Sequence, residues 1–126
     1  MTAPSLEFNK HTEMELCTMN STIYEIRKYH ALPGKWDELL TQFDQHLVQI
    51  FADKGIASHG YWRDLGQQDV LVYLVSHQGD PEANWNAFRA DPRWLAIRDA
   101  SSAGPQWLVS SIETTRLEAT AFSPLG

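Results

Sequence analysis

The chain has 126 residues, 43% of them apolar or aromatic, which is enough for a single domain with one core. Sixteen acidic residues against ten basic ones give a net charge of −6, and this balance argues against nucleic acid as a partner because phosphate binding requires a basic surface. The apolar runs are far shorter than the ~20 residues that cross a bilayer, and the polar N-terminus has no signal-peptide pattern. We therefore predict a cytoplasmic protein that has no membrane partner.

Residues 1–20 have neither helical nor strand periodicity. We predict that they form an N-terminal arm and that residues 21–126 form one domain. Cys17 lies in this arm and is the only cysteine of the sequence, so an internal disulfide is excluded and there is no thiol cluster for zinc.

The first half of the predicted domain alternates strand, helix and strand. β-Branched and aromatic residues at 22–30 predict a strand, and Leu32, Pro33 and Gly34 end it in a turn. Apolar residues at spacings of three, four and seven then predict a helix over about 35–53. The next segment, 56–64, is again typical of a strand.

The second half adds a strand, an interrupted helix and a last strand. The nearly continuous apolar run at 70–76 predicts a strand covered on both faces, joined to the preceding one as a hairpin. Asp80 and Pro81 are typical first residues of a helix, which we expect to be interrupted at Asp91 and to place Trp94 in the core. Residues 107–117 predict the last strand.

The order strand-helix-strand-strand-helix-strand predicts an α+β, ferredoxin-like fold with a four-stranded antiparallel sheet in the order 4-1-3-2. Two helices can cover only one face of this sheet. In the third strand, Tyr73 and Val75 alternate with Val72 and Leu74, so both faces are apolar. We predict that a second copy of the chain covers the free face and that the protein is a homodimer.

Several segments together are similar to a known family. They are IYEIRKY before a PGK turn, a helix that contains QHL and is followed by KGI, the strand GYW, and ADPRWLAI in the second helix. They resemble the NIPSNAP family of the dimeric α/β-barrel superfamily, over about residues 22–116. The resemblance implies a ferredoxin-like subunit that pairs sheet to sheet with its twin. It implies no particular reaction, because the superfamily includes cofactor-free oxygenases, haem-degrading enzymes and small isomerases.

Two charged residues occupy the first strand, which we expect to be central. Glu25 and Arg27 lie on the same side, with Tyr29 beside them, and a charge in a covered strand must be paired or meet a charged ligand. One interpretation is an anion or carbonyl site in which Arg27 donates a forked hydrogen bond. The other is an ion pair of Glu25 and Arg27 with residues of the last strand, such as Glu113 or Arg116.

Histidines supply further candidates. His46 lies at the edge of the apolar face of the first helix, where it could act as acid or base at neutral pH or simply complete the margin of the core. In the strand at 56–64, His59, Tyr61 and Arg63 share one predicted face. That face suits a pocket wall, or an edge strand whose polar side chains are in water.

Nothing in the sequence predicts a metal or a cofactor. The five histidines are dispersed and no spacing typical of metal ligands occurs. A glycine-rich phosphate loop is absent. A haem-degrading relative would be expected to carry an Asn in the first strand and a Trp in the third, and the sequence has neither.

Two functions remain open. The first is a homodimer of undetermined activity that binds a small, partly apolar ligand or a protein partner. The second is a cofactor-independent oxygenase or isomerase for a small aromatic or carbonyl compound, with His46 or His59 as the base and Arg27 stabilising an oxyanion. The second function requires these side chains to line one cavity. The predicted ligand-binding residues are Glu25, Arg27, Tyr29, His46, His59 and Tyr61.

Overall fold

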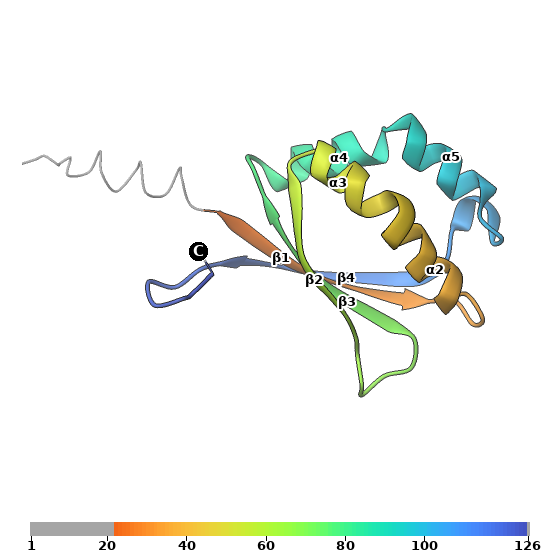
Figure 1. Ribbon diagram of the computed structural model, residues 1–126, viewed down its shortest axis with the longest axis horizontal. Coiled ribbons are helices and arrows are strands. Elements are labelled where there is room, and N and C mark those ends of the chain that lie inside the picture. Colours follow the sequence, from red (N-terminus) through yellow and green to blue (C-terminus); the bar gives the residue numbers. More distant parts are fainter. Residues whose placement is uncertain (1–21, 126) are drawn as a thin grey trace, which may run out of the picture. The chain divides into compact units, whose positions relative to one another are not determined.

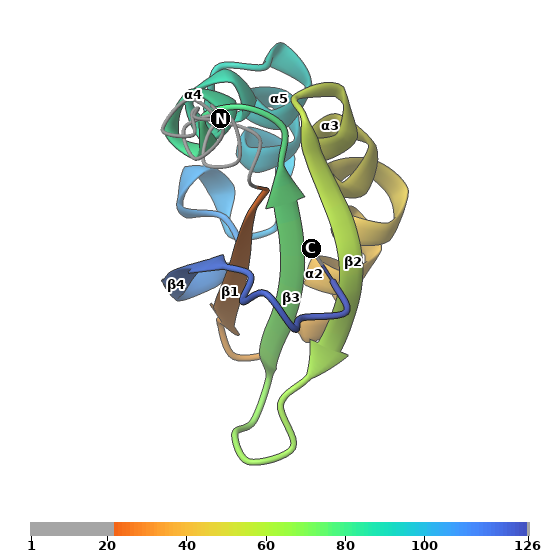
Figure 2. The ribbon, with the colours of Figure 1, turned by 90° about the vertical axis from the view of Figure 1, so that its left-hand side faces the viewer.

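The computed structural model describes residues 22–125, of which Ile23–Leu117 form one compact unit. Its strands are β1 (Ile23–Ala31), β2 (Ile56–Arg63), β3 (Val70–His77) and β4 (Val109–Glu118). They form one sheet in the order β2-β3-β1-β4 (Figure 2), which confirms the predicted antiparallel, ferredoxin-like fold. The predicted arm at 1–20, with Cys17, lies outside the described residues, and the domain limits stay a prediction.

The helices lie on one face of the sheet (Figure 1). The helix predicted over 35–53 consists of α2 (Trp36–Gln42), a π-helical turn (Phe43–Leu47) and α3 (Val48–Asp53). The second helical segment consists of α4 (Pro81–Arg89) and α5 (Pro92–Ala100), and a 3-10 turn (Gly104–Gln106) follows it. In the described part of the chain, no helix has the length and apolar composition needed to cross a membrane.

An Asp-Pro pair begins each of the last two helices. The carboxylate of Asp80 accepts a hydrogen bond from the backbone N–H of Ala83 at 2.8 Å, and that of Asp91 accepts one from Arg93 at 2.8 Å. These side chains satisfy N–H groups that have no partner within the helix, and the proline that follows each of them fits the first turn. The interruption predicted at Asp91 is therefore the N-cap of a separate helix.

The core between the sheet and the helices is aromatic. Phe51 and Tyr73 are completely buried, and the Phe43 ring lies edge-on to Tyr73 with ring centroids 5.3 Å apart. The ring of Phe51 makes a similar edge contact with Trp85 at 5.3 Å. Each fully buried large apolar side chain stabilises the fold by about 1.5–3 kcal/mol. The aromatic composition of the sequence is thus used mainly in this layer.

A β-bulge changes the faces of β2. The pairing with β3 shifts between Ser58 and Gly60, and beyond the shift the Tyr61 hydroxyl lies 2.7 Å from Ser58 Oγ on the helix side. His59 lies on the other side of the sheet, where its Nε2 is 2.7 Å from Ser76 Oγ. The prediction that His59 and Tyr61 share one face is wrong, because the extra residue of a bulge reverses the alternation.

The second face of the sheet carries no helix among the described residues. Ile26, Val72 and Leu74 lie on it and are partly exposed, with Ile26 paired to Leu74 across the strands. Their neighbours along the chain face the helices. Trp62 of β2 is 54% exposed. An apolar face of this kind agrees with the expectation that something covers it, and pairing with a second copy stays a prediction.

Candidate functional site

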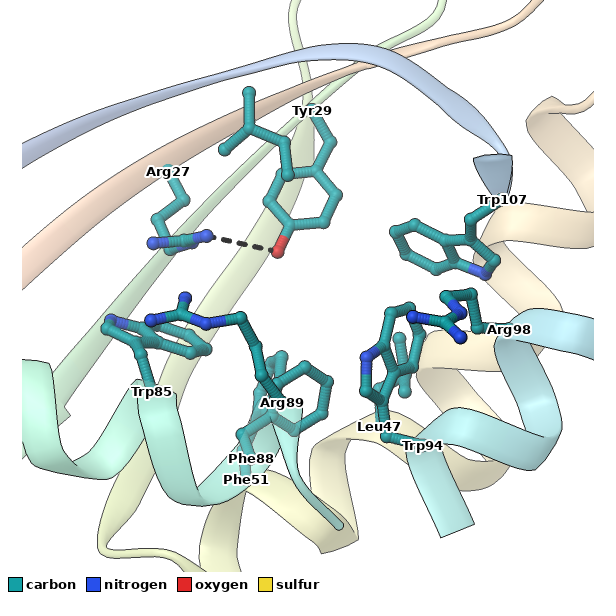
Figure 3. Close-up of a pocket in the computed structure, with 11 residues that line it drawn as sticks. Arg27, Tyr29, Leu47, Phe51, Trp85, Phe88, Arg89, Trp94, Arg98 and Trp107 are labelled. Carbon is teal, nitrogen blue, oxygen red and sulfur yellow. Dashed lines mark hydrogen bonds between the residues drawn. The ribbon is translucent and has the colours of Figure 1, made fainter. Parts of the chain in front are cut away.

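A cavity of about 260 Å³ lies between the sheet and helices α4 and α5 (Figure 3). An engineered apolar cavity of about 150 Å³ takes up benzene, so this space has room for one aromatic ring with a short chain. The wall is largely aromatic or aliphatic, and three guanidinium groups join it. The lining residues are Tyr29, Leu47, Phe51, Trp85, Phe88, Trp94, Trp107 and Ile112, with Arg27, Arg89 and Arg98.

Glu25 anchors the sheet next to this cavity without lining it. Its completely buried carboxylate accepts hydrogen bonds from Arg27 Nη1 at 2.9 Å, His77 Nε2 at 2.7 Å, Trp85 Nε1 at 2.9 Å and the Thr114 hydroxyl. Burial by itself would raise the pKa of Glu25, but these four hydrogen bonds outweigh it and hold the pKa well below its usual range. The carboxylate is therefore an anion whose partners are all supplied by the protein.

Arg27 combines the two interpretations of its sequence position. It is paired with Glu25, and it also lines the cavity, with its guanidinium carbon 4.1 Å from the centroid of the Trp85 ring. Burial would lower the pKa of Arg27, but the oxygens of Tyr29 and Tyr73 and the hydrogen bonds to Tyr29 and Glu25 raise it, so the group stays charged. The last strand contributes Thr114 and, at 3.8 Å from Glu25, the predicted Arg116 to this network. The predicted Glu113 pairs with His30 instead.

The hydroxyl of Tyr29 is the polar group at the inner end of the cavity. It accepts a hydrogen bond from the hydroxyl of Tyr73 at 2.9 Å and one from Arg27 Nη2 at 3.4 Å. Burial raises the pKa of Tyr73, which keeps that phenol protonated as the donor. Since both contacts use lone pairs of the Tyr29 oxygen, its own hydrogen must point elsewhere. Figure 3 shows this hydroxyl directed toward the space between the Trp85 and Trp107 rings.

Two irregular backbone segments meet at one wall of the cavity. Trp107 has φ 68° and ψ −156°, a region almost exclusive to glycine that costs about 1–3 kcal/mol. Its indole N–H donates a hydrogen bond to Gln42 Oε1 at 2.6 Å. Gln42 immediately precedes the π-helical turn, and Leu47 at the end of that turn lines the cavity. Strained residues and π-helical turns are both frequent at functional sites, so two independent backbone features indicate a functional role for this wall.

Arg89 and Arg98 lie at the solvent side of the cavity. Arg89 donates to Asn86 Oδ1 at 2.7 Å and has Glu82 at 3.7 Å, while Arg98 pairs with Asp99 at 3.0 Å. These partners are exposed, and exposed ion pairs contribute only about 0–1 kcal/mol. Both guanidinium groups can therefore exchange their present partners for a ligand at low cost.

Comparison with known proteins identifies the family of the chain. A family model for NIPSNAP matches residues 24–124. The chain belongs to the NIPSNAP family. None of the curated proteins matches it in sequence. The match confirms the resemblance that the sequence motifs indicated.

Solved structures similar to this NIPSNAP chain agree on the fold. An uncharacterized NIPSNAP domain protein from Burkholderia xenovorans is 23% identical, with a TM-score of 0.63 over 81% of this chain and 98% of that one. A NIPSNAP family protein from Agrobacterium tumefaciens is 25% identical, with a TM-score of 0.68 over 83% and 99%. A putative antibiotic biosynthesis monooxygenase from Chloroflexus aurantiacus is 19% identical, with a TM-score of 0.57 over 84% and 100%. The first and the last of these likenesses, both below 25% identity, concern the fold alone.

The predicted site residues of this NIPSNAP domain divide into two groups. Arg27 and Tyr29 line the cavity, and Glu25, which does not line it, forms an ion pair with Arg27. His46 is exposed on the π-helical turn beside a different, shallow depression that Arg93 also lines. The structure therefore brings the residues of the first strand together and leaves this histidine apart.

The predicted residues of the second strand also lie away from the cavity. His59 is on the opposite face of the sheet, next to Ser76. Tyr61 stacks on Tyr73 in the core with ring centroids 5.0 Å apart, and burial raises its pKa to about 12. The described residues contain no cluster of three or more side chains that could hold a metal ion. Any role of His46, His59 or Tyr61 toward a ligand stays a prediction.

Sequence reasoning missed most of the cavity wall of the NIPSNAP domain. Trp94 was expected only in the core, and it is buried there but also lines the cavity, as do Trp85, Arg89 and Arg98. A signal was present in the sequence. Two pentapeptides, WNAFR at 85–89 and WLAIR at 94–98, repeat the pattern Trp-x-Ala-apolar-Arg in consecutive helices. Because residues four apart lie on one helix face, each repeat presents its tryptophan and its arginine on the same side.

Proposed function

We propose that this NIPSNAP protein binds a small, partly apolar ligand in the cavity between the sheet and helices α4 and α5. The observation that carries the proposal is the cavity itself, because an apolar space of about 260 Å³ walled by three tryptophans is left open inside an otherwise closely packed core. The strained backbone of Trp107 supports it, since the fold tolerates an unfavourable conformation at this wall.

Binding is better supported than acid–base catalysis. A cofactor-independent enzyme would need a base beside Arg27, and neither His46 nor His59 is among the lining residues. The titratable side chains that do line the cavity are arginines and the phenol of Tyr29. These groups suit the recognition of a ligand by hydrogen bonding and charge more than they suit proton abstraction near neutral pH.

We also propose that the protein works as a homodimer. The face of the sheet opposite the helices carries Ile26, Val72 and Leu74 together with the exposed ring of Trp62. A second copy presents the same apolar residues, so the two faces can cover each other around a two-fold axis. The cavity lies on the other side of the sheet, and ligand binding and dimerisation can therefore be tested separately.

The tryptophans provide a direct test of ligand binding. In a protein labelled with ¹⁵N at the indole nitrogens, 3-phenylpropan-1-ol is titrated as a neutral probe with one ring and a short chain. We expect the indole N–H signals of Trp85, Trp94 and Trp107 to move, because their rings line the cavity. The signals of Trp36 and Trp62 are the internal control and should not move. No shift at millimolar probe, or equal shifts of all five signals, contradicts the proposal.

A pair of variants on one strand locates the site independently. Ile112 lines the cavity and is 42% exposed, so Ile112→Trp should narrow the entrance and weaken binding of the probe. Leu117 is similarly exposed, at 37%, but is not a lining residue. Leu117→Trp should therefore leave the affinity unchanged, and equal losses in both variants would place the probe elsewhere.

A further inference from the structure

We infer that the ligand of this cavity is a small aromatic carboxylate, whose ring packs against the tryptophans while a carboxylate oxygen accepts a hydrogen bond from Tyr29. This inference rests on the proposed function, because it specifies the chemistry of the same cavity. Three observations carry it, and they concern the charge of the wall, a repeated sequence pattern and the hydrogen bonds of one hydroxyl group.

The charge of the cavity wall is opposite to the charge of the protein. The chain carries 16 acidic and ten basic residues, yet three arginines line the cavity and no acidic side chain of the described residues does. Arg27 is neutralised by the buried Glu25, whereas Arg89 and Arg98 at the opening have only exposed partners, Glu82 and Asp99, which an anionic ligand can replace at low cost. A concentration of guanidinium groups on an acidic protein attracts anions and disfavours cations.

The repeat Trp-x-Ala-apolar-Arg places these charges beside aromatic rings. In each of α4 and α5 the arginine follows a cavity-lining tryptophan by four residues, as in Trp85 with Arg89 and Trp94 with Arg98. Figure 3 shows Arg89 reaching toward the Trp85 side of the cavity and Arg98 lying on the side of Trp107. Two helices thus supply the same pair of groups, a flat apolar surface and a cation, which is what a ring bearing a negative charge requires.

Tyr29 requires a hydrogen-bond acceptor on the part of the ligand that it contacts. The Tyr29 hydroxyl oxygen receives hydrogen bonds from Tyr73 and Arg27, so its own hydrogen is available for donation to a ligand in the cavity that Tyr29 lines. The group that meets it must accept a hydrogen bond, as a carboxylate oxygen does and an ammonium group cannot. Arg27 has further N–H groups beyond the two that contact Glu25 and Tyr29, so the same end of the cavity remains rich in donors.

A series of three compounds with the same ring and chain tests the charge. They are 3-phenylpropionate, 3-phenylpropan-1-ol and 3-phenylpropylamine, which are negative, neutral and positive at pH 7. Dissociation constants come from tryptophan fluorescence, and the indole N–H signals of Trp85, Trp94 and Trp107 report the site. We expect the carboxylate to bind at least about 10-fold more tightly than the alcohol, and the amine to bind most weakly.

Tyr29 and Tyr61 form the matched pair of variants for the hydrogen bond. Tyr29→Phe keeps the ring and removes the donor, and it should weaken carboxylate binding at least about 10-fold. Tyr61→Phe removes a phenol hydroxyl that hydrogen-bonds with Ser58 and does not line the cavity, so affinity should stay within about 2-fold. If Tyr29→Phe does not fold, variants of Arg89 and Arg98 at the opening provide the test.

The charge of the opening is tested with the double variant Arg89→Gln, Arg98→Gln. It should reduce the preference for the carboxylate over the alcohol, because these charges attract the anion from the opening, and it should reduce the salt dependence of carboxylate binding. Arg63→Gln, whose guanidinium lies over the Trp36 ring away from the cavity, controls for the change of net charge and should leave the preference intact.

The possible outcomes separate this inference from the proposed function. If the alcohol moves the cavity tryptophans but the carboxylate binds no more tightly, or the amine binds equally well, the inference is overturned and the cavity remains a ligand site. If none of the three compounds moves these signals, both are overturned. If the preference for the carboxylate is as large in Tyr29→Phe and in the double arginine variant as in the wild type, the proposed contacts of the carboxylate with these residues are wrong.

Discussion

Nε2 of His77 lies 2.7 Å from Oε1 of Glu25, and neither side chain is exposed to solvent. The other ring nitrogen, Nδ1, lies 3.2 Å from the amide nitrogen of Asn84, which is a donor, so the ring accepts there and donates to Glu25. The Glu25 charge is balanced mainly by Arg27, with Arg116 at 3.8 Å. This carboxylate thus joins β1, β3, β4 and α4 behind the cavity.

Replacing the central carboxylate should be strongly destabilising. Glu25→Gln leaves Arg27 buried without its partner and turns an amide N–H toward the donors of His77 or Trp85. We expect the free energy of unfolding in urea to fall by about 3–5 kcal/mol. Glu113→Gln is the matched control, because Glu113 is 62% exposed and pairs with His30 at the surface, and the loss of stability should stay below about 1 kcal/mol. Equal midpoints for wild type and Glu25→Gln would contradict the network.

The pKa of Glu25 gives the fold a defined response to acid. Its pKa is depressed in the folded state, so its contribution to stability is fully present above the unfolded-state value of about 4.5. Below that pH the unfolded chain takes up a proton that folded Glu25 does not bind, and the contribution is progressively lost. The difference in unfolding free energy between wild type and Glu25→Gln should therefore be constant from pH 7 to 5.5 and shrink below pH 4.5. If this difference in unfolding free energy grew toward low pH, the pKa of Glu25 would be raised and not lowered in the folded state.

The fold could be predicted because its signals are local. The spacing of Trp36, Leu39 and Phe43 places them on one helix face, and the alternation along β3 separates its two faces. The charged pair in β1 could also be predicted, since residues two apart on a central strand must share a side. The observed contact of Glu25 with Arg27 agrees with that spacing.

The cavity could not be predicted in the same way, because its wall is assembled from segments far apart in the chain. Trp107 contributes through a backbone conformation that no residue other than glycine normally adopts, and periodicity contains no information about it. The bulge at Ser58 adds one residue and reverses the faces expected for His59 and Tyr61. The local signals for the wall were the spacing of Arg27 and Tyr29 in β1 and the repeated Trp-x-Ala-apolar-Arg pattern of α4 and α5.

The strain at Trp107 predicts that a glycine variant is more stable than an alanine variant at this position, the reverse of the usual order. Both Trp107→Ala and Trp107→Gly remove the indole and its hydrogen bond to Gln42. Glycine adopts φ 68° and ψ −156° without a steric penalty, whereas alanine does not. We expect Trp107→Gly to be more stable than Trp107→Ala by about 1–3 kcal/mol in urea denaturation.

A helical tryptophan supplies the control for this inversion. Trp85 lies within α4, where glycine is less favourable than alanine by about 0.5–1 kcal/mol. Trp85→Gly should therefore be less stable than Trp85→Ala, opposite in sign to the pair at 107. The same order at both positions would mean that Trp107 is not strained.

The proposed homodimer is tested on the face of the sheet that lacks helices. Leu74 lies on that face, and it alternates with Tyr73 and Val75, which are buried on the other side. Light scattering at micromolar concentration should give twice the mass of one chain for the wild type. Leu74→Glu places a charge within the expected interface, where it would be desolvated without a partner, and should give the monomer mass.

The matched control for this variant carries the same change on a helix. Leu40 of α2 is 37% exposed and lies on the helical side of the sheet, so Leu40→Glu should leave the mass doubled. Far-UV circular dichroism of Leu74→Glu should match the wild type, because Leu74 is only partly buried within one chain. A wild type that scatters as a single chain at every concentration would remove the dimer proposal, and a doubled mass in both variants would move the interface away from this face.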